Sequence, residues 1–319
     1  MEILNWIKRF FQKMKKNRLI RFTWKNRWVR FAFLGLLLFY LVGFIGPLFA
    51  PYDPLSTSLE ESFLAPSQDH LFGTDRLGRD VFSRVLFAMR TTSIISLLVF
   101  IFGGWVLNVG LGIIAGYYGG KIDSFILRIG ETISSVPPLV FLILFLVSFR
   151  DGFEAWMLKI TESSGLTWIV NSGIVQMIPV MLALALISWV GGVYPIRSRV
   201  LQEREQGYVE SLRVLGASEW RIMFNHILPN VMGLVILSLS AILISAIGLE
   251  VGLSFLGLGI RDPYPSFGVM FYQSANLGLL RNHPYLLIIP GIIVFYIGML
   301  CWVLGDQWGK MIESKRSYD

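Results

Sequence analysis

The sequence predicts an all-helical integral membrane protein with six membrane-spanning helices. Hydrophobic residues make up 54% of its 319 residues and charged residues only 15%, and its mean hydropathy is strongly positive. This composition excludes an ordinary water-soluble enzyme. Apolar segments long enough to cross a bilayer recur along the chain, and we predict spans over residues 31–50, 94–117, 132–149, 174–193, 231–258 and 285–304.

Residues 1–30 form a basic segment that we expect in the cytoplasm, because segments rich in lysine and arginine stay inside. Glu2 is its only acid, and its basic residues are Lys8, Arg9, Lys13, Lys15, Lys16, Arg18, Arg21, Lys25, Arg27 and Arg30. The apolar run over residues 31–50 is long and lacks a small-residue cleavage site, so we expect a retained first span rather than a signal peptide. Six crossings would return the C-terminus to the cytoplasm.

Residues 51–93 are expected to form an external loop with an amphipathic helix. Asp75 is placed to cap a helix that begins near Arg76 and lies along the outer membrane face. Asp75, Arg79 and Asp80 are otherwise expected only to hold the loop by ion pairs, which are weak when exposed. The rest of the chain, residues 94–319, is predicted to form a five-helix membrane core.

Two spans carry glycine patterns. Gly112 and Gly116 lie four residues apart in the second span, and Gly248 and Gly252 lie four apart in the fifth. Both pairs predict close helix packing. The fifth segment is also long for one straight span and contains Gly257, so we expect a bend or break near its outer end.

Glu250 is the most conspicuous charge at membrane depth. A carboxylate is costly to bury there and usually faces a polar cavity or a partner. One interpretation is that Glu250 lines a pathway, where it would attract cationic groups. The other is that it ties two helices together near the outer surface.

The fourth and fifth spans are joined by a polar stretch, residues 203–230. Over residues 206–215 apolar and charged residues alternate as in a short amphipathic helix, and Gly216 supplies the permissive backbone of a helix C-cap. Ser218 is placed to cap a second short helix that Pro229 closes. The pattern predicts a compact cytoplasmic knob; the alternative is an amphipathic loop on the lipid surface.

This stretch resembles the "EAA" loop of ABC importer permeases, which reads Glu-Ala-Ala, three residues, glycine, nine residues, then an apolar residue, any residue, Leu-Pro. In that family the loop is a coupling helix that docks in a cleft of a cytoplasmic ATPase. Two residues that differ from the usual alanines make the knob bulkier here. The resemblance implies a docking role for Glu210, Ser211, Leu212, Gly216, Ala217, His226, Leu228 and Pro229.

Other segments resemble one branch of this family, the "C" subunit of its dipeptide/oligopeptide/nickel type. Residues 70–84, "HLFGTDRLGRDVFSR", are similar to the segment that follows the first span in that branch. Residues 250–268 and 304–314 match its outer fifth-span segment and its C-terminal end. Residues 150–173 depart from it as a longer external connection, either a docking surface or a segment that lies on the membrane.

Residues 117–140 are similar to the family's first cytoplasmic loop. The resemblance implies that Asp123 and Arg128 sit on a short helix that contacts the ATPases. It also implies that Pro137 and Pro138 enter the third span.

The resemblance implies the type I ABC importer permease fold, with cytoplasmic termini, in a bacterial or archaeal inner membrane. The chain would form half of a translocation pathway for di- or oligopeptides. Its partners would be a homologous "B"-type permease, two cytoplasmic ABC ATPases, an extracytoplasmic binding protein and membrane lipid. The positive net charge then reflects topology and lipid contact rather than nucleic acid.

The chain is not expected to be an enzyme or to hold a cofactor or metal. It has no phosphate-binding loop, a single cysteine and three scattered histidines; ATP and Mg²⁺ would be bound by the partner ATPases. Within the family, oligosaccharides or nickel are alternative substrates. The alternative of another class is a self-contained secondary transporter with Glu250 as its coupling carboxylate, but the two halves show no internal repeat.

Overall fold

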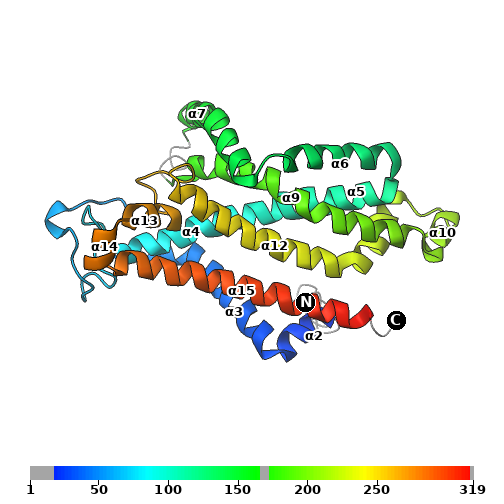
Figure 1. Ribbon diagram of the computed structural model, residues 1–319, viewed down its shortest axis with the longest axis horizontal. Helices are drawn as coiled ribbons and strands as arrows, with labels where there is room; N and C mark the ends of the chain where they lie inside the picture. The colour runs from blue at the N-terminus through cyan, green and yellow to red at the C-terminus, as the bar shows by residue number, and fades with distance from the viewer. Residues whose placement is uncertain (1–17, 166–171, 317–319) are drawn as a thin grey trace, which may run out of the picture.

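The computed structural model describes residues 18–165 and 172–316, with side chains placed over 22–165 and 172–311 (Figure 1). The predicted cytoplasmic residues before Arg18 lie outside this range. Apart from one isolated bridge, between Thr74 and Asp80, the regular structure of the described residues is helical. The helices are α2 (Arg18–Lys25), α3 (Arg27–Ile45), η1 (Gly46–Phe49), η2 (Leu59–Glu61), α4 (Val81–Val99), η3 (Phe100–Val109), α5 (Gly110–Tyr118), α6 (Gly120–Ser134), α7 (Pro138–Ser164), α9 (Ile174–Arg204), α10 (Gly207–Val214), α11 (Glu219–Arg221), η4 (Ile222–Ile227), α12 (Leu228–Phe255), α13 (Phe267–Ser274), α14 (Leu277–Asn282) and α15 (Tyr285–Arg316).

Five of these helical stretches are long and apolar enough to cross a membrane, and a bent pair could supply a sixth. They form an elongated bundle with α10 at one end and α13, α14 and the loop over residues 51–80 at the other (Figure 1). The start of α2 and the end of α15 lie in the half that holds α10. The five stretches are Arg27–Phe49, Val81–Tyr118, Ile174–Arg204, Glu219–Phe255 and Tyr285–Met311.

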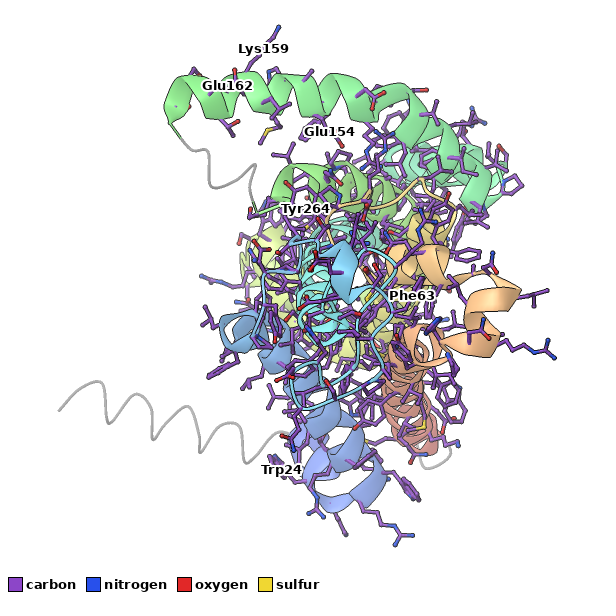
Figure 2. The ribbon with its side chains drawn as sticks, turned by 90° about the vertical axis from the view of Figure 1, so that its left-hand side faces the viewer. Trp24, Phe63, Glu154, Lys159, Glu162 and Tyr264 are labelled. Atoms are coloured by element: carbon purple, nitrogen blue, oxygen red, sulfur yellow. The ribbon has the colours of Figure 1, made fainter. Side chains whose placement is uncertain are left out.

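The predicted third span, residues 132–149, has the wrong bounds. The chain bends by 89° between α6 and α7, because Pro137 and Pro138 follow one another and each disfavours helix in the residue before it. As the resemblance implied, Asp123 and Arg128 lie on the short helix before the prolines, and α7 begins at Pro138. Figure 2 looks along the bundle and shows α7 lying across it.

Part of the connection expected over residues 150–173 is helical, because α7 continues to Ser164. Residues 166–171 lie outside the described residues. Arg150 is buried, and its Nη1 donates to the carbonyl oxygen of Leu258 at 2.9 Å. Its Nε donates to Glu154 Oε1 at 2.7 Å. Arg150 therefore fastens α7 to the loop that follows α12.

One of the two predicted glycine contacts is confirmed. Gly112 and Gly116 face α9 so closely that a Cβ on Gly116 would lie 2.6 Å from the carbonyl oxygen of Arg197. The prediction for Gly248 and Gly252 is wrong, since no atom lies within 4 Å of a Cβ built on either. The α12 surface is open there because no helix within residues 18–165 and 172–316 covers it.

The difference in packing predicts that a glycine-to-alanine substitution, which adds one methyl group, has different effects on stability at positions 116 and 248. Gly116→Ala should lower the free energy of unfolding by about 1–3 kcal/mol, because a backbone carbonyl and a β-branched side chain must move. Gly248→Ala should be neutral or stabilising by up to about 1 kcal/mol, since it fills open space in a helix. Unfolding of both variants in mild detergent measures this, and equal losses would contradict the packing described here.

The predicted helix end at Pro229 is also wrong. The chain is helical without interruption from Glu219 to Phe255, 37 residues, and η4 gives it a wide π-helical turn just before the proline. Such a turn relieves the clash of the proline ring with the preceding carbonyl. The break expected near the outer end of the fifth span is confirmed as its end, since Gly257 follows α12 with φ +75°.

Candidate functional site

Residues 203–230, here called the knob, fold into a compact unit at one end of the bundle. α10 spans Gly207–Val214, which confirms the short helix predicted over residues 206–215. Its end is a Schellman motif: the Gly216 amide donates to the Arg213 oxygen and the Ala217 amide to the Leu212 oxygen, both at 3.0 Å. Gly216 has φ +76°, a conformation that glycine adopts without strain.

Apolar side chains beneath α10 and η4 attach the knob to the bundle. Val209 is the buried residue of α10, and η4 buries three more. Together they pack on the ends of α5, α9 and α12, so the knob is anchored to three long helices. The buried residues of this core are Val109, Ile113, Tyr117, Ile196, Val200, Val209, Ile222, Met223, Ile227, Val231, Val235 and Leu239.

Glu203 braces the knob from the end of α9, a role that the sequence analysis missed. Its Oε2 accepts from the Tyr208 hydroxyl at 3.1 Å and from Asn230 Nδ2 at 3.3 Å. Arg199 Nη2 lies 2.9 Å from its Oε1. Burial, together with the Glu203 carboxylate, raises the pKa of Tyr208, so the hydroxyl remains a donor. In the sequence, the bracing role of Glu203 is indicated only by its four-residue spacing from Arg199, which predicts an ion pair on one helix face.

Three large apolar side chains stand exposed at the tip of the knob. Val214 is 84% exposed, Leu215 80% and Trp220 61%, and the Trp220 ring stacks on Phe224 at 5.2 Å between centroids. We call Val214, Leu215 and Trp220 the apolar tip. The charged residues next to it in the sequence are exposed as well, namely Arg213, Glu219 and Arg221, and an apolar patch with a polar rim marks a protein-contact surface. The amphipathic pattern of the sequence did not predict that these three residues would be exposed together.

The predicted docking residues divide by exposure. Half of them are half-buried and brace the knob from within: Leu212, Ala217, His226 and Leu228. The other half are exposed: Glu210, Ser211, Gly216 and Pro229.

On α6, Asp123 and Arg128 have different surroundings. Asp123 is buried, and both of its carboxylate oxygens accept from the guanidinium of Arg197 on α9. This pair fixes the start of α6 against the bundle. Arg128 is exposed, and so is Phe125, three residues before it on the same helix, at 67%.

Glu250 lies inside the bundle with no exposed surface. Its Oε2 accepts from Thr92 Oγ1 of α4 at 3.1 Å, and its Oε1 accepts from Ser254 Oγ at 3.0 Å. Ser266, in the segment before α13, also hydrogen-bonds the carboxylate. These contacts support the interpretation in which Glu250 ties α12 to its neighbours.

The two interpretations of Glu250 predict different effects of substitutions at this position on stability and transport. Glu250→Gln should change the free energy of unfolding by less than about 1 kcal/mol and leave transport intact, because the amide still bonds the three hydroxyls. Glu250→Leu should cost about 1–3 kcal/mol, since it leaves buried hydroxyls without an acceptor. Unfolding in detergent and uptake into vesicles measure both, and a folded Glu250→Gln chain that cannot transport would favour the pathway interpretation.

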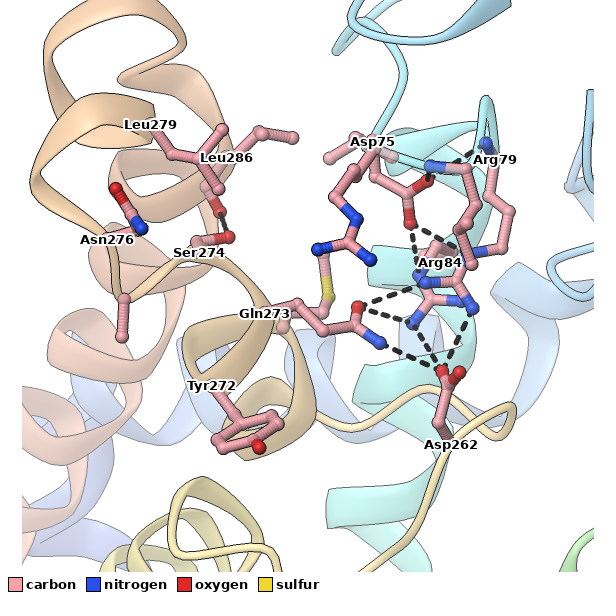
Figure 3. Close-up of a pocket in the computed structure, with 15 residues that line it drawn as sticks. Asp75, Arg79, Arg84, Asp262, Tyr272, Gln273, Ser274, Asn276, Leu279 and Leu286 are labelled. Carbon is pink, nitrogen blue, oxygen red and sulfur yellow. Dashed lines mark hydrogen bonds and ion pairs between the residues drawn. The ribbon is translucent and has the colours of Figure 1, made fainter. Parts of the chain in front are cut away.

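A polar cluster of Asp75, Arg79, Arg84, Asp262 and Gln273 (Figure 3) lies beside α13, at the end of the bundle opposite α10 (Figure 1). Arg79 Nε donates to Asp75 Oδ2 at 2.7 Å, and Arg79 Nη1 donates to Asp262 Oδ1 at 2.9 Å. Gln273 Oε1 accepts from both Arg79 and Arg84, at 3.1 and 3.3 Å. Both arginines are buried, so these are not the exposed ion pairs that we predicted from the sequence.

The predicted helix cap at Asp75 is wrong. α4 begins at Val81, and the cap is Asp80, whose Oδ2 accepts from the Ser83 amide at 2.7 Å. Asp75 instead accepts from the Leu77 amide at 2.8 Å within a turn that Gly78 closes with φ +70°. That turn prevents a helix from starting at residue 76.

The charge state of Asp262 follows from its neighbours. Burial alone would raise the pKa of Asp262, but the hydrogen bond and charge of Arg79, helped by Gln273 and Arg84, lower it below its ordinary value. Asp262 therefore stays ionised at neutral and mildly acidic pH.

The fold and the site define a class of protein: an all-helical multi-pass membrane protein with a braced apolar tip at one end. Residues 108–317 match the family described as "Binding-protein-dependent transport system inner membrane component". The match covers well over half of the chain, and the chain belongs to this family.

Its similarity to curated relatives extends further along the chain. It is 33% identical over 316 residues to the dipeptide transport system permease protein DppC of Bacillus subtilis, covering 98% of this chain and 87% of the relative. It is 31% identical over 300 residues to the oligopeptide transport system permease protein OppC of the same organism, covering 92% and 90%. It is 29% identical over 312 residues to the glutathione transport system permease protein GsiD of Pectobacterium atrosepticum, covering 94% of each.

Proposed function

We propose that this chain is one permease subunit of an ATP-driven importer and forms half of its translocation pathway. The observation that carries the proposal is the apolar tip, which is held on a braced knob and left exposed by the described residues. Its rim of charge suits a cleft in a water-soluble partner better than lipid. The sequence carries no phosphate-binding loop of its own, so the partner at the tip would be the ATPase.

The knob end is the cytoplasmic end in this proposal. The start of α2, the end of α15 and α10 lie in the same half of the bundle (Figure 1). Arginines also gather near the knob, as the positive-inside rule requires; they are Arg197, Arg199, Arg204, Arg213 and Arg221. The opposite end, with the loop over residues 51–80, then faces outside.

The continuous helix from Glu219 to Phe255 would transmit movement across the membrane. Its 37 residues correspond to about 55 Å at the rise of an α-helix. One end lies in the knob, and the other is tied to α4 through Glu250. Two ATPases that close on ATP would pull on this subunit and a homologous partner permease, opening the pathway between them to the other side.

Peptides are the proposed substrate, delivered by an external binding protein. The relatives at 33% and 31% identity are named for dipeptide and oligopeptide transport, and another is named for glutathione, itself a small peptide. These names favour peptides over oligosaccharides and nickel. A self-contained secondary transporter is less well supported, because Glu250 is enclosed and all its described partners are hydroxyl groups.

Co-purification tests this proposal. The chain, purified at native expression level in mild detergent, should bring down a second six-span permease and phosphate-loop ATPases. Gly216→Pro should lose the ATPases but keep the permease, because proline removes the Gly216 amide and cannot adopt φ +76°. Pro54→Ala, at the opposite end, should keep both. A wild-type chain that arrives alone or as a homo-oligomer would refute the proposal.

A further inference from the structure

A cavity of about 540 Å³ lies at the end of the bundle opposite the knob, between the polar cluster and α13–α14 (Figure 3). The mechanism proposed above makes no use of it. Its volume is in the range of sites that bind small organic molecules. The residues that decide its chemistry are Arg76, Arg79, Arg84, Asp262, Gln273 and Asn276.

The charges that line the cavity do not balance. Three guanidinium groups face two carboxylates, those of Asp75 and Asp262. Asp75 is engaged with Arg79 and two backbone amides. Arg76 is exposed, and its side chain forms no ion pair or hydrogen bond within the part of the chain that the structure describes. The cavity therefore carries one uncompensated positive charge.

Asp262 is the replaceable anion of the cluster. Its side chain is 49% exposed, whereas those of Arg79 and Arg84 are 3% and 1% exposed. It reaches Arg79 Nη1 at 2.9 Å, Arg84 Nη2 at 3.9 Å and Gln273 Nε2 at 2.9 Å. These three donors converge on Oδ1 of Asp262, which lies on a loop, and their geometry would suit any carboxylate.

The facing wall of the cavity carries apolar side chains beside the polar Ser274 and Asn276 (Figure 3). In Figure 3, Leu279 and Leu286 lie across the cavity from Asp75 and Arg84, and Val81 and Met270 also line it. A molecule with a carboxylate at one end and an apolar side chain next to it would satisfy both walls. That is the chemistry of the C-terminal residue of a peptide.

We propose that this cavity is a binding site for the C-terminal carboxylate of a peptide, held by Arg76 and by the donors that Asp262 now occupies. The proposal rests on the proposed function for the choice of peptides. It assigns the permease a recognition site of its own, at the end where peptide would arrive. A carboxylate that enters either pairs with Arg76 beside Asp262 or displaces Asp262 from the buried guanidinium groups.

Peptide binding to the full-length chain in lipid nanodiscs tests this site. The probes are alanyl-phenylalanine and its C-terminal amide, with affinity measured by calorimetry. The free acid should bind at least about tenfold more tightly than the amide, which is the usual contribution of a charge-assisted hydrogen bond. Saturable binding of the amide with equal affinity, or no binding of the acid, would overturn the proposal.

Two variants should shift the affinity for the acid in opposite directions. Arg76→Ala should weaken it about tenfold, because the unpaired guanidinium is lost. Asp262→Asn should strengthen it by a similar factor, because the built-in anion is removed while the hydrogen bond to Gln273 can persist. Lys159→Ala and Asp151→Asn, exposed charges that do not line the cavity, should leave it unchanged. Equal affinities in all four variants would overturn the proposal.

The cavity proposal and the importer proposal can fail independently of one another. If acid and amide bind equally while the ATPases still co-purify with the chain, the cavity proposal fails and the importer proposal stands. If the acid binds as described but no ATPase accompanies the chain, the cavity is a carboxylate site and the importer proposal fails.

Discussion

Leu215→Asp is expected to weaken ATPase binding severely while the chain remains folded. Leu215 is 80% exposed, so its replacement removes little packing within the chain. Within an apolar cleft of a partner, the new carboxylate would lose its hydration without gaining a counter-charge. A central contact of this kind contributes about 2–4 kcal/mol, which is roughly a thirtyfold to thousandfold loss of affinity.

The expected loss is measured by titrating purified ATPase against the wild-type chain and the variant in nanodiscs. Leu277→Asp is the matched control, because Leu277 is 86% exposed and belongs to α14 at the opposite end. Its ATPase affinity should equal that of the wild type. Similar losses in both variants would show that an added charge, rather than the apolar tip, causes the effect.

Asp75→Ala is expected to destabilise the chain more than any other single change discussed here. The variant leaves Arg79 and Arg84 buried without the carboxylate that lies 2.7 Å from one and 3.7 Å from the other. Removing one member of a buried ion pair costs about 3–5 kcal/mol, and the two buried guanidinium groups would then share the half-exposed carboxylate of Asp262. The backbone turn that Asp75 closes would be lost as well.

Unfolding of this variant in mild detergent, followed by far-ultraviolet circular dichroism, measures the cost. Asp69→Ala is the control, since Asp69 is exposed on the same loop and forms no described side-chain bond. It should change the free energy of unfolding by less than about 0.5 kcal/mol. A loss for Asp75→Ala no larger than that of the control would contradict the role of the polar cluster.

Local signals allowed the short helices to be predicted better than their surroundings. α10 and its glycine end follow from the alternation of residues 206–215 and from Gly216, because a Schellman motif involves only neighbouring residues. The prolines at 137 and 138 carried an equally local signal. The span predicted over residues 132–149 ignored it, since hydropathy averaged over a window does not register a backbone break.

The wrong predictions for the external loop concern contacts between distant residues. Asp75 and Asp80 are both acceptable helix caps in the sequence, and the turn at Gly78, which is held by the rest of the loop, decides between them. Arg79 donates to Asp262, which lies 183 residues further along the chain, and no sequence pattern predicts that pair. The loop was therefore predicted to hold exposed ion pairs where the structure has buried ones.

The apolar tip was missed for a related reason. Amphipathic spacing identifies which residues of a short helix share a face, but it does not say which face the protein covers. In the knob, Val209 and the buried residues of η4 fill the available core, and Val214 and Leu215 are left outside. Only the arrangement of α5, α9 and α12 determines this outcome.

Cross-linking in native membranes can establish whether the apolar tip docks on an ATPase. The chain has one cysteine, Cys301, which is buried, so Leu215→Cys in a Cys301→Ser background offers a single reactive thiol. The expected product joins this chain to a phosphate-loop ATPase, and its yield should change when ATP is added. If Leu215→Cys gives no ATPase product, or gives no more than Leu277→Cys, the tip is not a coupling site.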